Sequence, residues 1–140
     1  MVTQYEPKKT NRWILRFPAE YNIPEWIIYE TSRPTIRVKT NIFGFKKFSY
    51  DIINISMRDT VVNSVTKSVY ELFNKLKDTD QLDALYYELE MLDPTGVVVE
   101  QWLISGCSIV SIDYGYLSMD DDSIATVTLR VKPIRAKLIK

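Results

Sequence analysis

Residues 85–104, which read LYYELEMLDPTGVVVEQWLI, predict a β-hairpin. Before the turn, every second side chain is apolar, as in a half-buried strand; these residues are Leu85, Tyr87, Leu89 and Met91. The turn itself is Asp93-Pro94-Thr95-Gly96, with Asp first, Pro second and Gly fourth, which matches a type I turn. Residues 97–104 then return as the second strand of the hairpin.

Further short strands are expected on both sides of the hairpin. They are residues 12–17, 26–29, 35–39 and 48–57 before it, and residues 107–112 and 125–131 after it. Gly106 is expected to allow a bend or bulge, and Pro133 to separate the last strand from a short apolar tail. Residues 48–57 carry apolar side chains on both faces, which predicts burial on both, either by the chain's own core or by a neighbouring subunit.

One amphipathic helix is predicted at Asn63–Lys77. Its apolar residues fall on a single stripe that is expected to pack on the sheet, at Val65, Val69, Leu72, Phe73 and Leu76. Asn63 or Ser64 can cap its start. The expected fold is therefore mainly β: a two-sheet β-sandwich or barrel of about seven strands with one flanking α-helix. Residues 12–140 are expected to form a single domain, and residues 1–11 an arm that orders only against a partner.

The sequence contains no histidine and a single cysteine, Cys107. These two facts exclude the usual general base near neutral pH, the Ser-His-Asp and Cys-His catalytic arrangements, and the common structural zinc sites. An intramolecular disulfide is excluded as well. Cys107 is expected to be a small buried residue in a strand.

Carboxylates offer the remaining chemistry, and none forms a recognisable site. Asp51, Asp59 and Asp113 show no spacing that singles out a general acid and a general base. The aspartates of Asp120-Asp121-Asp122 are consecutive, whereas a calcium loop alternates its ligands and adds a Gly and a distal Glu. They are expected to form a solvated loop. We therefore expect no catalytic residue, no metal site, no cofactor and no enzymatic activity.

Basic and acidic residues balance at 18 each, so the net charge gives no support for binding to nucleic-acid phosphates. The loop of residues 40–47 leaves one local exception open, because Lys46 and Lys47 lie between Phe45 and Phe48. Such a cluster can stack on single-stranded bases, or it can be a charged hairpin tip that protects the edges of a sheet. No Gly-rich phosphate loop, helix-turn-helix or RNA-recognition signature accompanies it.

Three tryptophans and nine tyrosines exceed what a compact core of this size hides, and both residue types are enriched at protein interfaces. No apolar run is long enough to cross a bilayer, and residues 1–12 lack the apolar segment of a secretory signal. We therefore expect an assembling protein that folds in a cytoplasm and does not insert into a membrane.

Residues 88–131, ELEMLDPTGVVVEQWLISGCSIVSIDYGYLSMDDDSIATVTLRV, resemble the C-terminal half of tail-tube proteins from phages and related contractile injection systems. In that family the same places hold a D-x-x-G turn, a strand containing Trp, a connection with an aromatic-Gly or Pro step, and a strand of the form E/S-I-x-x-x-x-L. The first half of the chain follows the family more loosely. A strand at 13–17, a turn at 29–34, a strand at 48–57 and the helix come in the family's order.

The resemblance implies a structural protein of the virion. Its subunits would close into rings, commonly hexamers, and the rings would stack into a hollow tail tube that conducts phage DNA without binding it specifically. The implied partners are further copies of the chain, the tail sheath, the tape-measure protein and the baseplate, with assembly in the host cytoplasm. A baseplate, tube-initiator or tail-terminus protein of the same fold is the first alternative, and a nucleic-acid-binding β-barrel is the second.

The resemblance also implies two contact regions. The first would bridge successive rings or subunits, together with the N-terminal arm; it consists of Thr40, Asn41, Ile42, Phe43, Gly44, Phe45, Lys46 and Lys47. The second is the polar face of the last predicted strand, which would face the lumen or a neighbour; it consists of Thr126, Thr128 and Arg130.

Overall fold

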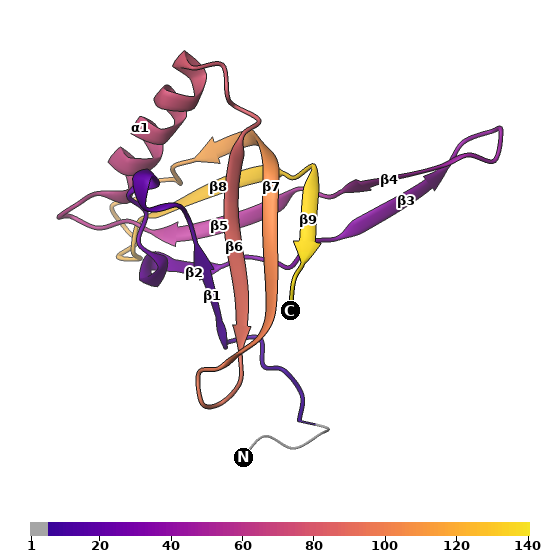
Figure 1. The fold of residues 1–140 in the computed structure, drawn as a ribbon. Coiled ribbons are helices and arrows are strands. Elements are labelled where there is room, and N and C mark those ends of the chain that lie inside the picture. The colour runs from indigo at the N-terminus through magenta and orange to yellow at the C-terminus, as the bar shows by residue number, and fades with distance from the viewer. Residues whose placement is uncertain (1–5) are drawn as a thin grey trace.

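The computed structural model describes residues 6–140. This part of the chain contains one α-helix, α1 (Val65–Asp78), and two 3-10 helices, η1 (Ala19–Tyr21) and η2 (Glu25–Ile27) (Figure 1). Its strands are β1 (Trp13–Arg16), β2 (Ile28–Glu30), β3 (Ile36–Thr40), β4 (Lys46–Tyr50), β5 (Ile53–Arg58), β6 (Leu85–Leu92), β7 (Val98–Asp113), β8 (Thr126–Lys132) and β9 (Arg135–Leu138). No helix within residues 6–140 is long and apolar enough to cross a membrane.

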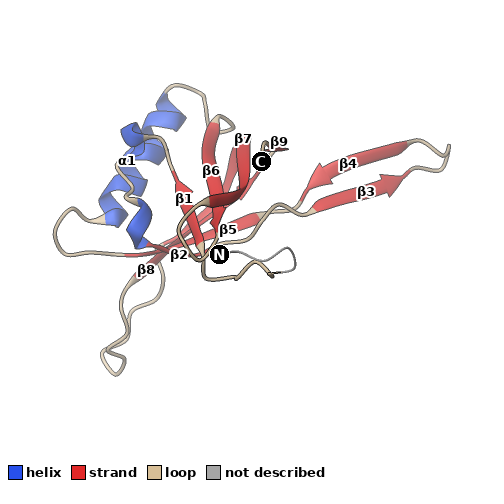
Figure 2. Ribbon diagram, turned by 60° about the horizontal axis from the view of Figure 1, so that its bottom comes forward, coloured by secondary structure: helices blue, strands red, loops and turns tan. Residues whose placement is uncertain are grey.

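One curled sheet of seven strands forms the body of the protein (Figures 1 and 2). Its order is β1-β6-β7-β8-β5-β2, β9 also pairs with β7, and the pairings are antiparallel. β3 and β4 pair with each other and extend away from the body as a two-stranded arm, which we call the β3–β4 ribbon. The expected mainly-β fold with one flanking helix is confirmed, as a curled sheet with a second, small sheet.

Strand β7 joins the two halves of the curled sheet. Its first part pairs with β6 and β9, whereas Ser108–Asp113 pair with β8. The change occurs at Gly106, where the register with β6 shifts and φ is 62°. A Cβ at this left-handed position would lie 3.1 Å from the Arg135 guanidinium and 3.2 Å from the Cβ of Ile134. The predicted bend is confirmed, but the two strands predicted on either side of it are one strand.

The β6–β7 hairpin has the predicted turn. The Gly96 N–H donates to the Asp93 carbonyl oxygen (3.0 Å), and Gly96 has a φ of 88°. The Asp93 carboxylate accepts from the backbone N–H groups of Thr95 (2.8 Å) and Val97 (2.9 Å). Hydrogen bonds, first of all from the Thr95 hydroxyl, hold the pKa of Asp93 below its ordinary value.

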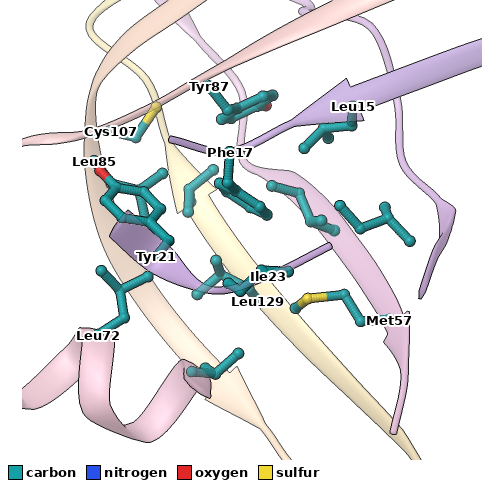
Figure 3. Close-up of a cluster of buried hydrophobic side chains, with 14 of the residues drawn as sticks. Leu15, Phe17, Tyr21, Ile23, Met57, Leu72, Leu85, Tyr87, Cys107 and Leu129 are labelled. Carbon is teal, nitrogen blue, oxygen red and sulfur yellow. The ribbon is translucent and has the colours of Figure 1, made fainter. Parts of the chain in front are cut away.

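The core gathers side chains from the curled sheet and from α1 (Figure 3). The predicted helix is confirmed, and Ser64 caps it by accepting from the Lys67 N–H. Its buried residues belong to the predicted stripe and are Val65, Val69, Leu72 and Leu76. Phe73, the fifth residue of that stripe, is only partly buried and lies beneath the Lys77 ammonium, 5.6 Å from the ring centroid.

Residues 48–57, predicted as one strand, are two strands. β4 ends at Tyr50 and β5 begins at Ile53, because the chain leaves the β3–β4 ribbon at this point and enters the curled sheet. The alternate side chains of β5 face the core, at Ile53, Ile55 and Met57. Phe48 and Ile52 are exposed, so the chain's own core does not bury both apolar faces of this segment.

Two shorter segments also differ from the prediction. Residues 25–27 form η2 rather than the start of a strand, because Pro24 has the φ of –69° that suits the entry to a helix, and β2 begins at Ile28. The tail after Pro133 forms β9, which pairs with residues 102–105 of β7. The prediction of about seven strands missed β9 because four residues are too few to show a period.

A buried carboxylate ties two distant segments of the chain to one end of the core. Glu100 on β7 accepts from Lys8 Nζ (2.7 Å), from Arg33 (3.2 Å) and from the Trp102 indole N–H (2.7 Å). Burial raises the pKa of Glu100, but the hydrogen bonds from Lys8 and Trp102 and the nearby cations outweigh it, so the pKa lies below its ordinary value. Lys8 belongs to the predicted arm (residues 1–11), of which residues 1–5 lie outside the described residues.

Glu100→Gln is expected to lower the free energy of unfolding by about 1–3 kcal/mol at pH 7, because a buried charged acceptor loses its charge. The difference from the wild type should shrink towards pH 3. Because the pKa of Glu100 is lower in the folded than in the unfolded chain, where it is about 4.3, ionised Glu100 stabilises the fold above that pH, and this contribution is lost as the pH falls through the folded pKa. Urea unfolding at pH 7 and pH 3 measures the free energy of unfolding of both proteins. Glu88→Gln, a less buried glutamate on β6, is the control, and an equal loss in both variants would contradict the assignment.

Candidate assembly surfaces

The β3–β4 ribbon has one apolar and one basic face. Cross-strand pairs of Ile36 with Tyr50 and Val38 with Phe48 alternate with pairs of Arg37 with Ser49 and Lys39 with Lys47. On the apolar face Ile36, Val38 and Phe48 are 55%, 61% and 70% exposed. A two-stranded ribbon is marginally stable in water unless its apolar face packs on something. This face therefore has the character of an interface.

The residues predicted as a contact region form the far end of the ribbon. Thr40 ends β3, Lys46 and Lys47 begin β4, and residues 41–45 form the tip. The Asn41 side chain accepts from the N–H groups of Phe43 and Phe45, both at 2.9 Å. Gly44 donates to the Asn41 carbonyl (3.1 Å) with a φ of 82°, so the tip repeats the construction of the Asp93 turn.

The tip presents large apolar side chains to solvent. Ile42, Phe43 and Phe45 are 93%, 77% and 68% exposed. At the other end of the ribbon, Arg37 donates two hydrogen bonds to Asp51 (2.9 and 2.7 Å), and these bonds lower the pKa of Asp51. The ribbon is therefore fixed at its base, while its tip has no cover within residues 6–140.

The second predicted contact region lies on the outer face of the curled sheet. Thr126, Thr128 and Arg130 alternate along β8 with core residues, which are Val127, Leu129 and Val131. Their neighbours across the strands are polar as well: the Ser56 and Thr128 hydroxyls lie 3.3 Å apart, and Arg130 donates to Ser111 (3.3 Å). The structure thus brings the three predicted residues together on one polar face.

Arg130 is partly neutralised on this face. One of its guanidinium nitrogens lies 3.9 Å from a carboxylate oxygen of Asp113 on β7. The outer face of β5, β7 and β8 therefore combines hydroxyl groups with offset charges and carries no large apolar side chain from β8. Such a polar surface is suited to contact with solvent and not to packing in a hydrophobic core.

The sequence analysis missed a groove beside α1. The elements that line it lie at the end of the body remote from the ribbon (Figure 1). The groove has a volume of about 940 Å³ and runs between η1, η2 and the segment that joins β5 to α1. Its large exposed apolar residues are Trp26, Val61 and Val62. The signal in the sequence is Val61-Val62 within an otherwise polar turn before a helix cap.

Asp59 organises the segment that forms one wall of this groove. Its carboxylate accepts from the N–H groups of Thr60 (2.9 Å) and Val65 (2.9 Å) and from the Ser64 hydroxyl (3.2 Å). A carboxylate at a helix N-terminus also interacts favourably with the helix dipole. Burial raises the pKa of Asp59, but the hydrogen bonds, chiefly from the Thr66 hydroxyl, outweigh it, so the pKa lies below its ordinary value.

The β7–β8 connection lies beside the same segment, because the Asp59 N–H donates to the Ala125 carbonyl (2.9 Å). This connection carries Asp120-Asp121-Asp122 together with the exposed apolar residues Tyr116, Leu117 and Met119. Asp121 accepts from the Ser123 N–H (2.9 Å). Within residues 6–140 no group of three or more His, Cys, Asp or Glu side chains could hold a metal ion.

The other groups considered for chemistry have structural partners. Asp51 binds Arg37, Asp59 binds the start of α1, and Asp113 accepts from the Gly115 N–H (2.8 Å). Cys107 is buried in β7 as predicted, and burial raises the pKa of its thiol to about 12, far from the reactive range. The features that the fold does not explain are surfaces: the apolar ribbon and groove, and the polar outer face of β8.

No protein-family model matches the sequence, and no curated protein matches it. Among solved structures, a chain of the anti-feeding prophage cap, a tube-terminating cap, superimposes with a TM-score of 0.67 at 15% identity, over 99% of this chain and 93% of that one. This chain has the tail-tube-like fold. A chain of the sheath–tube complex of the extracellular contractile injection system PVC superimposes with a TM-score of 0.67 at 11% identity, over 96% of this chain and 93% of that one.

A chain of the anti-feeding prophage baseplate, described as 6-fold symmetrised, gives a TM-score of 0.64 at 15% identity, over 97% of both chains. The tail-tube-like fold therefore recurs in tube, cap and baseplate complexes of contractile injection systems. The resemblance drawn from residues 88–131 is confirmed at the level of the fold.

Asp59→Ala is expected to lower the free energy of unfolding by about 1–2 kcal/mol, because the start of α1 loses its cap and its anion. Asp59→Asn keeps most of the hydrogen bonding without the charge, so its loss should be smaller. Because the folded pKa is depressed, the wild-type advantage should fade as the pH drops below about 4. Urea titrations at pH 7 and pH 3 measure the free energy of unfolding. An Asp59→Ala variant as stable as the wild type at pH 7 would contradict the assigned role of Asp59.

Proposed function

We propose that this protein is a structural subunit of the tube of a phage-like contractile particle and that it works by binding further copies of itself. The observation that carries the proposal is the β3–β4 ribbon, whose apolar face and tip project into solvent from a folded body. Burial of apolar area is the main driving force for association, so these side chains favour contact with another chain. The tail-tube-like fold supports the same role.

The proposed assembly is a ring, most simply a hexamer, and rings stack into a hollow tube. The matched baseplate is 6-fold symmetrised, which supports this ring size. The exposed ribbon, with residues 40–47 at its end, and the N-terminal arm provide contacts between subunits or rings. Sheath and baseplate components are the proposed partners, since the matched chains come from sheath–tube and baseplate complexes.

The polar face of β8 is proposed to line the lumen. Thr126 and Thr128 offer hydroxyl groups, and Arg130 is offset by Asp113. A wall with little net positive charge gains little from counterion release, so it lets DNA pass without holding it. The balance of 18 basic and 18 acidic residues agrees with a passive conduit, and the role requires no catalytic step.

A cap or baseplate protein is the second candidate, because chains from both kinds of complex match this fold about as well as the chain of the sheath–tube complex. Such a protein forms one ring and does not polymerise. The number of copies per particle separates the two roles: many copies indicate a tube subunit, and a single ring's worth indicates a cap or baseplate component.

Purified protein, concentrated slowly, is expected to form rings or stacked tubes that negative-stain electron microscopy can see. Rings that never stack at any concentration would favour the cap or baseplate role. A species that stays monomeric at high concentration, alone and with sheath and baseplate proteins of its particle, would contradict the proposed function.

A further inference from the structure

A small cavity lies where the segment before β1 meets the segment between β2 and β3, and its volume is about 210 Å³. Side chains of two paired strands form its apolar wall: Trp13 on β1, and Leu89 and Met91 on β6. Its rim is polar and includes Thr10 and Arg33. This cavity, which we call the β1–β6 cavity, therefore offers an apolar interior beside a cation.

Glu100 holds the two sides of the β1–β6 cavity in place. Lys8, two residues before Thr10, and Arg33 both donate to the same carboxylate oxygen of Glu100, at 2.7 and 3.2 Å. The Trp102 indole N–H donates to the other oxygen (2.7 Å), so both oxygens have partners. Because these bonds fix the rim before any ligand arrives, little ordering is left for binding to supply.

The charged groups at the rim leave one positive charge over. The two segments of the rim, residues 6–12 and 30–33, together with the clasping carboxylate contain four cations and three anions: Lys8, Lys9, Arg12 and Arg33, and Glu6, Glu30 and Glu100. Glu100 balances only one of the two cations that it binds. The Arg33 side chain is 55% exposed and bonds Glu100 through one nitrogen, so its other N–H groups can bind an anion at the rim.

We propose that the β1–β6 cavity binds the C-terminal residue of a partner polypeptide that ends in a large apolar side chain. The side chain enters the cavity beside the Trp13 ring, and the terminal carboxylate pairs with Arg33. A volume of about 210 Å³ suits one large side chain and is smaller than the sites that enclose a whole small molecule. The rest of the partner chain leaves past the rim, where the hydroxyl groups of Thr10 and Ser32 bond its backbone.

Each part of the site selects against another class of ligand. Arg33 pairs with a carboxylate through two parallel hydrogen bonds, which a neutral amide end cannot match. The surplus positive charge repels a cation and balances one carboxylate. The wall of Trp13, Leu89 and Met91 gains from burying an apolar side chain and leaves a polar one without hydrogen-bond partners. The site lies outside the β3–β4 ribbon and does not depend on the proposed tube role.

Fluorescence anisotropy tests the site with a labelled pentapeptide that ends in phenylalanine and has a free carboxylate. The wild-type protein is expected to bind this peptide saturably, with a Kd below about 1 mM. The same peptide with an amidated end should bind at least about 10-fold more weakly, because a charge-assisted hydrogen bond is lost. A peptide that ends in alanine should also bind at least about 10-fold more weakly, because the cavity stays unfilled.

Two variants and a matched control locate the binding. Arg33→Gln should weaken binding of the free-carboxylate peptide at least about 10-fold and leave the amidated peptide unchanged. Lys9→Gln removes a positive charge from the same rim without lining the cavity, so it should change the affinity by less than about 2-fold. Thr10→Phe, at an exposed position, covers the cavity with a ring and should abolish binding while Arg33 is still present. Circular dichroism shows whether each variant is folded.

Equal affinity for the free-carboxylate and amidated peptides, or no saturable binding, would overturn the carboxylate site. Binding that survives both Arg33→Gln and Thr10→Phe would place the peptide elsewhere on the protein and overturn it as well. N-acetylphenylalanine presents the same end without a chain and competes with the labelled peptide. Competition as tight as that of the unlabelled pentapeptide would overturn the assignment to a polypeptide end, and competition at least about 10-fold weaker would support it.

Discussion

The curled sheet depends on the hydrogen bonding of β7, which spans Val98–Asp113. β6, β8 and β9 bond to it directly, and β1, β5 and β2 attach through them. Because Gly106 permits a left-handed backbone at the middle of this strand, the two halves of the sheet turn relative to each other and enclose a core beneath α1. The sheet is complete without β3 and β4, and this leaves the ribbon outside the body.

The ribbon is consequently the part of the fold that lacks a core of its own. Hydrogen bonds at its base and tip define its shape, but Ile36, Val38 and Phe48 stay in water. A protein that keeps such a surface gains stability when a neighbour covers it. The polar outer face of β8 has a matching use in the proposed assembly, as the wall of the lumen.

The sequence predicted those features that depend on local pattern. The Asp93–Gly96 turn, the alternation along β6 and β8 and the stripe of α1 each need only a few neighbouring residues. The split at residues 51–52 was missed, because Phe48 and Ile53 belong to strands that face different surroundings, and their joined pattern imitates one doubly buried strand. The groove was missed because η1, η2 and the β5–α1 segment meet only after folding.

Hydrogen exchange tests the central claim that a neighbouring copy covers the ribbon. In the unassembled subunit at low concentration, amides of β3 and β4 should exchange quickly, whereas amides of β6 paired with β7 should be protected, because local stability follows buried apolar contact. In the assembled particle, exchange in the ribbon should slow by about 100-fold or more while β6 changes little. Equal protection of the ribbon before and after assembly would contradict the account.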